Sequence, residues 1–558
     1  MSMTNSFLKQ KFEGVNVLIL APHQDDEVHV AGGLLSSFTD AGADVYVVYT
    51  TNGDYKFLAS TRYREAIKAL KIAGVPKDNV IFLGYADGCI NRKHIFYTED
   101  KPQISIAGYV HTYGVEDFPD YSWNKRHKHS SYTKNDYEKD LENVILDIMP
   151  DVILCVDYDH HCDHRMLSVS FDSIMGKILC EQKGKYTPLV YKILSYAVAY
   201  EAKPDFYAVN ILSVPKPVVG EVLGYDMDIL DYSMYDWEQR VRFPVNTKCR
   251  GRFLHDNILF RALTCHYSQG AAMHAEYCIN GDIVYWQRRT DNLLSYAQLS
   301  ANCGNPNALK EFRLYAVKSI FPIRQQLEFE DSMWEVKDEA ELNIFWDEPQ
   351  LICQLVFWGN INRTGNVEKI LIEFDNGEKS VTGALPKCGK AYIINLPTKV
   401  LSSYCRIKIL KKSGVCGINY LGIYSDKYQK GVIKPFIKIL INGDFAYDYW
   451  IKRNVRDVSI NLYRYACDDD IEIKVVSNCF SKYANDVLTI DDRDGAITVR
   501  AVSKVDENIF DEIVIVRKSY FSLFKLWLLQ RIEKRVIKFL LRRLKKYTYL
   551  RNRYLKDI

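Results

Sequence analysis

The alternation of strand-like and helix-like segments in the N-terminal part of the chain limits the fold more than any other feature. Runs rich in β-branched and aromatic residues predict strands at 15–21, 44–50, 79–84 and 151–156. Helical periodicity predicts helices between them, at 31–41, 60–73 and 136–148. Strands that alternate with helices in this way favour a mostly parallel sheet with helices on both faces. We therefore expect a Rossmann-like α/β domain over residues 1–300.

Two clusters of histidines and acids follow two of these strands. His23, Asp25, Asp26 and Glu27 come directly after the first strand, and residues 157–165 after the fourth strand hold three histidines and three acids. In the common strand order 3-2-1-4-5, the first and fourth strands are neighbours, and ligands bind outside their carboxyl ends. The two clusters are therefore expected to face each other.

A bound divalent cation would account for this concentration of charge. Carboxylates at such density repel one another and are costly to bury unless something neutralises them. Neutral imidazole together with carboxylate is a common zinc ligand set. For the first cluster alone, the alternative is an ordinary loop in which Asp25 or Asp26 caps the following helix.

The two clusters resemble the signatures of the PIG-L/LmbE-like family of zinc-dependent de-N-acetylases, His-Pro-Asp-Asp-Glu and His-Pro-Asp-His. Supporting matches are Thr51-Asn52-Gly53, Arg62-x-x-Glu65, Phe82-Leu-Gly-Tyr-x-Asp87-Gly88, His266-x-Ser268-Gln269 and Trp286-x-Arg-Arg289-Thr-Asp291. The resemblance covers about residues 10–300. Both signature prolines are replaced, by Gln24 and Cys162, which loosens each loop without removing a ligand. Cys162 also places a thiol beside the expected metal, as an alternative ligand or a redox-sensitive position.

The resemblance implies a set of metal ligands and a base. His23, Asp26 and His164 would hold Zn²⁺ and leave one position open for water, as hydrolytic zinc sites require. Asp25 would be the general base that takes the proton from that water.

The resemblance also implies roles around the metal. His161 would stabilise the developing oxyanion or protonate the leaving amine, with Asp163 orienting it. Arg62 and Asn52 would contact the substrate. Glu27 is expected behind the ligands, as an acid of the second layer or as a helix cap. The long connection at 85–134 is typical of a lid or a binding surface.

From about residue 301 onward, short strands separated by turn residues replace the alternating pattern. This spacing predicts two β-sandwiches, at 301–430 and, smaller, at 431–517. The expected strands are 327–329, 341–345, 351–357, 369–374, 391–396, 405–410 and 420–424, then 436–441, 458–463, 471–476, 487–490, 496–502 and 512–516. The first sandwich resembles galactose-binding-like or discoidin-like modules. A carbohydrate-binding surface, a rigid spacer and a dimerisation domain all remain open for it.

The C-terminal segment 518–558 differs in charge from the rest of the chain. It carries 13 Lys and Arg and two acids, a net charge of +11, whereas the remainder carries −8. It is predicted to be an amphipathic helix with one apolar face, made of Leu526, Leu529, Ile532, Val536, Leu540 and Leu544. A basic face opposite an apolar one is typical of a helix that lies on an anionic membrane surface. The alternative is a helix docked on its own protein or on a dimer partner.

These features favour a cytoplasmic enzyme that the C-terminal helix would hold peripherally at the inner membrane face. Scattered cysteines, the lack of a signal segment and the lack of a long apolar run support this location. The leading hypothesis is zinc-dependent de-N-acetylation of an N-acetylated amino sugar in a glycan or glycolipid precursor of a surface polysaccharide. The alternatives are deacetylation of a soluble pseudo-disaccharide or glycoside in thiol-cofactor biosynthesis, a metal phosphoesterase, and a non-catalytic glycan-binding protein. No nucleic-acid partner is expected, and the oligomeric state stays open.

Overall fold

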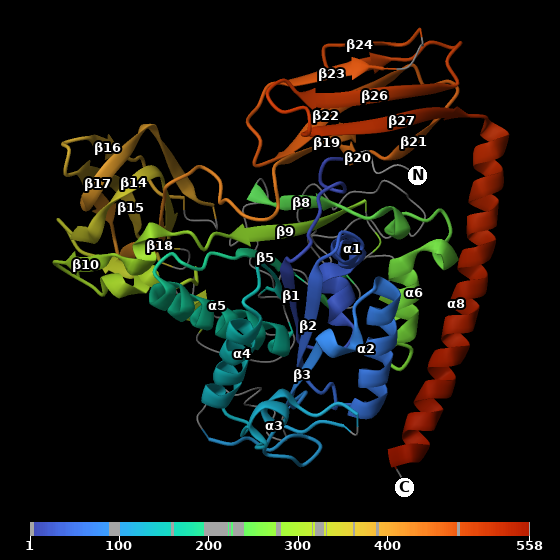
Figure 1. The fold of residues 1–558 in the computed structure, drawn as a ribbon, viewed down its shortest axis with the longest axis horizontal. Coiled ribbons are helices and arrows are strands. Elements are labelled where there is room, and N and C mark those ends of the chain that lie inside the picture. The colour runs from blue at the N-terminus through green and yellow to red at the C-terminus, as the bar shows by residue number, and fades with distance from the viewer. Residues whose placement is uncertain are drawn as a thin grey trace.

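The computed structural model describes residues 5–556 with the exception of 89–100, 116, 158–160, 195–220, 223–224, 227–238, 275–278, 280, 315, 318–328, 331, 361–362, 387–389 and 477–479. Asp159, His160 and most of the strand expected at 327–329 therefore lie outside the described residues. A central α/β unit has one β-rich unit beside it and another above it, and a long C-terminal helix runs along its flank (Figure 1).

Seven strands form the central sheet, in the order β3-β2-β1-β4-β5-β9-β8. Their bounds are β1 Asn16–Ala21, β2 Asp44–Thr51, β3 Val80–Tyr85, β4 Val152–Val156, β5 Leu189–Ile193, β8 Val241–Pro244 and β9 Asp282–Arg288. The strands from β3 to β5 are parallel, and β9 and β8 extend one edge in antiparallel pairing. The predicted mostly parallel sheet is confirmed, and β1 and β4 are neighbours.

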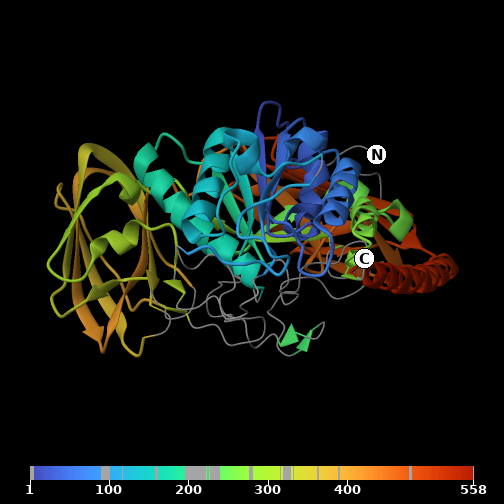
Figure 2. The same cartoon turned by 90° about the horizontal axis from the view of Figure 1, so that it is seen from below.

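Helices flank this sheet on two sides. Every residue of 17–21 and 152–156 is fully buried, as expected for parallel strands covered on both faces. One group of helices packs together on one side and a pair packs on the other (Figures 1 and 2). The first group is α1 Asp26–Asp40, α2 Ala59–Ala73 and α6 Ile258–Cys265; the pair is α4 Lys134–Ile148 and α5 Cys162–Gln182. The short helix α3, Tyr121–Arg126, lies in the long connection and contacts β3.

The middle unit is an antiparallel β-sandwich built from one folded sheet, ordered β13-β18-β14-β17-β15-β16, with β10 added to β14. Its strands are β10 Gln298–Ala301, β13 Trp334–Val336, β14 Glu341–Gly359, β15 Asn366–Phe374, β16 Lys379–Val381, β17 Tyr392–Ser413 and β18 Cys416–Tyr424. Two pairs of expected strands are each one long strand in the structure. The strands expected at 341–345 and 351–357 form β14, and those expected at 391–396 and 405–410 form β17. The residues between them form register shifts instead of turns, so both halves of each strand stay paired and share one core.

The C-terminal unit is a smaller sandwich of two sheets, β20-β19-β22-β25-β24 and β21-β27-β26-β23. The strands are β19 Phe436–Ile441, β20 Asp444–Phe445, β21 Asp448–Lys452, β22 Asp457–Tyr465, β23 Ile471–Val475, β24 Lys482–Ala484, β25 Val487–Thr489, β26 Ala496–Ser503 and β27 Phe510–Lys518. Phe436 and Tyr465 also belong to the hydrophobic core of the central sheet. The Asn5 amide donates to the Ile437 carbonyl over 2.9 Å, so the N-terminus packs on this sandwich as well.

Four further strands of two residues each lie outside these sheets. They form the pairs β6 Glu221–Val222 with β7 Tyr225–Asp226, and β11 Ala316–Val317 with β12 Phe329–Glu330. The cysteines within the described residues are free thiols. Within the same residues, no helix combines the length and apolarity needed to cross a membrane.

The C-terminal helix α8, Tyr520–Lys556, docks along α6 (Figure 1). Gln530 donates to the Arg252 carbonyl over 2.8 Å, and Glu533 accepts from the backbone N–H of Leu254 over 3.1 Å. Ile537 and Leu541 pack against the apolar cluster that contains Leu254. The docked stripe differs from the predicted apolar face. On that face Leu529, Ile532, Val536 and Leu540 are each 44–51% exposed.

Candidate metal and catalytic site

The loop after β1 brings His23 and Asp26 together. Both side chains are buried, and Asp26 Oδ2 lies 3.0 Å from His23 Nδ1. Asp26 Oδ2 also accepts from the backbone N–H of His23 over 3.0 Å, which fixes the turn. Asp25 occupies the N-cap position of α1, but its side chain makes no capping hydrogen bond. The acids of this loop therefore serve the cluster rather than the end of the helix.

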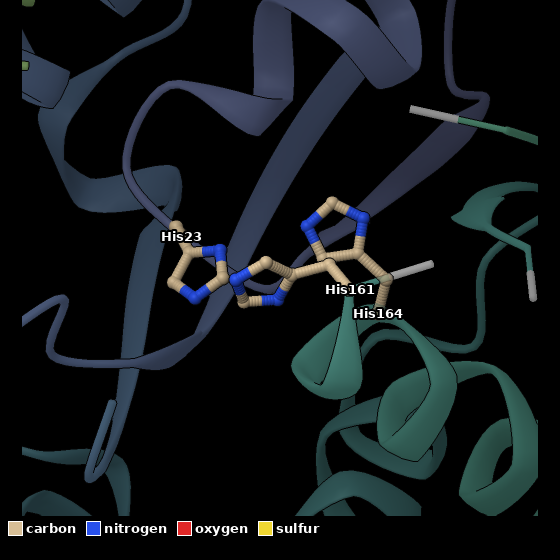
Figure 3. Close-up of side chains that lie close together, drawn as sticks. All are labelled: His23, His161 and His164. Carbon is tan, nitrogen blue, oxygen red and sulfur yellow. The ribbon is translucent and has the colours of Figure 1, made fainter. Parts of the chain in front are cut away.

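The start of α5 supplies the facing histidines. His161 is the N-cap residue, and its Nδ1 accepts from the backbone N–H of Asp163 over 3.3 Å. His164 is fully buried, and its Nε2 lies 3.2 Å from Asp26 Oδ2. The imidazoles of His23, His161 and His164 converge, with His161 between the other two (Figure 3). The two clusters predicted from sequence thus meet at the carboxyl ends of β1 and β4.

The donor atoms fit a small divalent cation. Tetrahedral zinc with bonds of about 2.0–2.1 Å holds its donor atoms about 3.3 Å apart. Asp26 Oδ2 lies 3.0 Å from His23 Nδ1 and 3.2 Å from His164 Nε2, close to that spacing. Ligand atoms of His23, His161 and His164 also all lie within 4.8 Å of one another. His23 also groups with Asp87 and Asp163, and His161 with Cys162 and Asp163, at distances that could hold an ion, so the ligand set of His23, Asp26 and His164 stays a prediction.

Two further carboxylates approach His23. Asp163 Oδ2 lies 2.7 Å from His23 Nε2, and Asp87 Oδ1 lies 3.5 Å from the same nitrogen. Asp163, expected to orient His161, thus directs its backbone N–H at His161 and its carboxylate at His23. Asp87 had no role assigned from the sequence beyond its place in a matching motif. Its position just after β3, at the same edge of the sheet, was the available signal.

These contacts set the protonation of the cluster. Burial alone would lower the pKa of His23, but Asp87, Asp163 and Asp26 raise it well above its usual value. Burial opposes the negative charge of Asp26, yet His164 and His23 hold its pKa well below the usual range. Burial raises the pKa of Asp163 to about 6, although His23 opposes the rise. A protonated His23 therefore balances the acids when no cation is bound, and a cation would displace that proton.

Arg62 holds the loops around the site. Its guanidinium is buried and donates to the carbonyls of Gln24, over 3.2 Å, and Gly53, over 3.3 Å. It also lies 3.2 Å from Asp25 Oδ1. The Gln24 side chain, which replaces the signature proline, donates to the Thr51 carbonyl over 2.6 Å. Gln24 thereby ties its loop to β2, so the loss of proline is compensated by a buried hydrogen bond.

Asp25 lies beside the cluster and is only 14% exposed. Burial raises the pKa of its carboxyl to about 6, with Asp26 adding to the rise and Arg62 opposing it. A carboxyl group with a pKa just below neutrality is suited to accept a proton at neutral pH.

Two other predicted residues are buried in polar contacts. Asn52 donates to the carbonyls of Gly84 and Tyr113, over 3.2 and 3.1 Å, and accepts from the Tyr63 hydroxyl. Its contact with substrate stays a prediction, and the structure gives it a loop-holding position. Glu27 Oε1 lies 2.6 Å from His266 Nε2, with both side chains buried behind the metal cluster. Sequence motifs contained His266 but did not indicate that it pairs with Glu27.

Comparison with protein families identifies the domain that contains this site. Residues 18–175 match the family model PIG-L, described as GlcNAc-PI de-N-acetylase. Residues 18–175 form a PIG-L domain. The predicted residues of both clusters lie within this range: His23, Asp25, Asp26 and Glu27 after β1, and His161, Asp163 and His164 at the start of α5.

Solved structures give more distant likenesses. The N,N′-diacetylchitobiose deacetylase from Pyrococcus horikoshii is 18% identical, over 35% of this chain and 65% of that chain, with a TM-score of 0.23. The family 32 carbohydrate-binding module of NanJ from C. perfringens is 11% identical, over 23% of this chain and 92% of that chain, with a TM-score of 0.18. No match to a curated protein sequence was found.

Proposed function

We propose that the chain is a zinc-dependent de-N-acetylase that hydrolyses the N-acetyl group of an amino sugar to a free amine and acetate. The observation that carries this proposal is the convergence of His23, Asp26 and His164 beside Asp25, within a domain that matches GlcNAc-PI de-N-acetylase. We also propose that the deacetylase domain ends at residue 300, the middle sandwich at 430 and the smaller sandwich at 517, before the C-terminal helix.

The residues around the metal position divide the chemistry. When bound, Zn²⁺ would lower the pKa of a water molecule and polarise the acyl oxygen. Asp25 would be the base for that water, because its carboxyl is ionised above a pH of about 6. His161, at the start of α5 and less buried than His23 and His164, stabilises the oxyanion or protonates the leaving amine. Arg62 fixes the Asp25 carboxylate through its 3.2 Å contact.

An aromatic stack in the long connection that follows β3 supports a saccharide substrate. The His129 ring stacks between Trp123, at 4.7 Å, and His111, at 5.0 Å. The connection is joined to the loop that follows β2 through Tyr113, whose hydroxyl donates to Asp54 over 2.7 Å. Trp123 is 44% exposed, so the long connection offers a sugar ring a flat apolar surface.

The exposed stripe of α8 supports attachment to an anionic membrane surface, where lipid-linked glycan precursors of surface polysaccharide would be met. Ile532 and Val536 are each 51% exposed although the helix is docked by another stripe. The basic residues of the segment 518–558 give it a net charge of +11. Apolar side chains flanked by Lys and Arg favour the interface of an anionic bilayer.

Acetate release tests the proposed reaction. The purified chain is incubated with a panel of lipid-linked, nucleotide-linked and free N-acetylhexosamines, with and without chelator. We expect chelator-sensitive acetate release from at least one substrate, with about one metal ion per chain. Release of phosphate instead, with two metal ions per chain, would support the metal phosphoesterase and contradict the deacetylase.

Liposome partition tests the membrane part separately. Ile532→Glu with Val536→Glu should reduce binding to anionic vesicles, because charge on the exposed stripe opposes insertion. Val505→Glu is the matched control, since Val505 is 80% exposed on the C-terminal sandwich. Equal partition of the double variant, the control and a chain lacking 518–558 would rule out membrane attachment through α8.

A further inference from the structure

A cleft of about 480 Å³ lies where the central sheet, the middle sandwich and the C-terminal sandwich meet. One wall is β9 of the central sheet, a second is formed by β14, β17 and β18, and the third is β22. Both sandwiches adjoin the β8–β9 edge of the central sheet in Figure 1. The volume falls within the range of about 300–1,000 Å³ that is usual for ligand sites.

The cleft is separate from the metal cluster. Its β9 residues Gln287 and Arg288 pair with Tyr191 and Val190, in the first half of β5. The metal cluster follows the opposite, carboxyl ends of the parallel strands. Val190 and Tyr191 lie two to three residues before the carboxyl end of β5, roughly 7–10 Å along the strand, and β4 lies between β5 and β1. Among the described residues, the lining of the cleft contains none of the predicted catalytic or metal-binding residues.

Among the residues that the structure describes, the lining is rich in cations and includes no acid. The basic side chains are Arg240, Arg288, Arg289, Lys427 and Arg464. Arg289 and Lys427 are paired with Asp291 and Asp468, over 2.7 and 2.6 Å. Arg464 is exposed, and its Nη1 donates to the carbonyl of Asp469 over 2.7 Å, a contact that leaves its charge in place. Arg288 lies 3.9 Å from Asp172, and Arg464 acts on the carboxylate of Asp468, so acids outside the lining balance part of this charge. The cationic side chains themselves line the cleft, where an anion can reach the exposed Arg464.

Aromatic and amide groups line the same cleft. Trp358 is half-buried and packs on the small apolar cluster of Val356, Ala391 and Tyr424, so one apolar wall is rigid. Gln354 lies in the same wall and donates to the side chain of exposed Asn395 over 2.8 Å. Flat apolar faces next to side-chain amides are the groups that contact the C–H faces and hydroxyls of sugars.

We propose that this cleft binds an anionic saccharide, a chain of sugar units that carry carboxylate or phosphate groups. The sugar rings lie against Trp358 and the neighbouring amides, and the anionic groups face Arg464 and the other cations of the cleft. The site holds a charged glycan away from the metal cluster, and its binding does not depend on the proposed deacetylase activity.

Calorimetric titration of the full chain tests this proposal. The probes are an oligogalacturonate, which carries carboxylates, a phosphorylated oligomannoside and an uncharged dextran oligosaccharide. We expect at least one anionic probe to bind at least tenfold more tightly than dextran, and more weakly as salt is raised. The anion that binds identifies carboxylate or phosphate as the recognised group.

Three variants locate the binding. Trp358→Ala and Arg464→Ala should each weaken binding at least tenfold, and the exposure of Arg464 makes its variant safe for folding. Arg493→Ala is the matched control, an exposed arginine of the C-terminal sandwich outside the cleft lining. Deacetylation of a monosaccharide substrate should be unchanged in all three. Equal binding of dextran, no binding of either anion, or unchanged affinity in Arg464→Ala would overturn the proposal.

Discussion

The ion pair between Glu27 and His266 joins α1 to the residue that follows α6, directly behind the metal cluster. The pair is 2.6 Å long, and its side chains are at most 1% exposed. His266→Ala would leave the Glu27 carboxylate buried without its cation, a change that costs about 3–5 kcal/mol. The pair Lys177–Glu142, which joins α5 to α4, provides a control of nearly equal length, 2.7 Å. Lys177 is 55% exposed, so Lys177→Ala should cost about 0–1 kcal/mol.

Hydrogen exchange of the α1 and α6 amides measures this difference without assuming that a chain with several domains unfolds in one step. A loss of about 3 kcal/mol corresponds to roughly 100-fold faster exchange in His266→Ala. Lys177→Ala should leave the rates of its own helix within a fewfold of wild type. Similar changes in both variants would refute the argument that burial decides the strength of these pairs.

The effect of His266→Ala should also depend on pH. Burial alone would lower the pKa of His266, but Glu27 and Asp25 raise it above its ordinary value of 6.5. The folded protein therefore binds this proton more tightly than the unfolded chain does. The stabilisation is fully present below pH 6.5 and is lost as the pH rises through the folded-state pKa. The difference between wild type and His266→Ala should shrink at high pH, and a difference that grows would contradict the assignment.

Three further predictions concern the site. The kcat/KM for deacetylation should rise as the pH is raised through about 6, because burial sets the pKa of Asp25 there and the base must be ionised. A bound cation shifts the midpoint of this rise to lower pH. A midpoint above pH 7 would exclude Asp25 as the base. Gly53→Ala should lower kcat/KM at least tenfold, because a Cβ would lie 2.5 Å from Arg62 Nη1 at a φ of +62°. Gly377→Ala, at a φ of +84° with open space around it, should show only the backbone strain, so equal activity losses would contradict the steric argument. Adding Zn²⁺ to metal-free protein at neutral pH should release protons. Calorimetry in buffers of different ionisation enthalpy measures this release. Zinc binding without proton release would show that His23 is not protonated before the metal binds.

The sequence predicted the parts of the site that depend on strand ends. Each apolar run ends in a cluster of polar residues, and parallel pairing brings those ends to one edge, so the meeting of His23 with His164 followed from strand order alone. Contacts between distant segments were not predictable in this way. Glu27 and His266 are separated by 239 residues, and only the packing of α1 against α6 brings them together.

The same limit explains the differences in the β-rich part of the chain. The residues between the strands expected at 341–345 and 351–357 include Pro349 and two acids, which local propensity assigns to a turn. Pairing with β17 on one side keeps the chain extended through a register shift instead. On α8, the sequence indicated an apolar face but not the second stripe that docks through Gln530 and Ile537.

The most direct test compares Asp25→Asn with His164→Ala, measuring metal content and acetate release on the same preparations. If Asp25 is the base and His164 a ligand, Asp25→Asn keeps its metal while turnover falls by about 10²–10⁴-fold. His164→Ala should lose both metal and turnover. Normal turnover in Asp25→Asn, or full metal content in His164→Ala, would contradict the roles assigned to these residues.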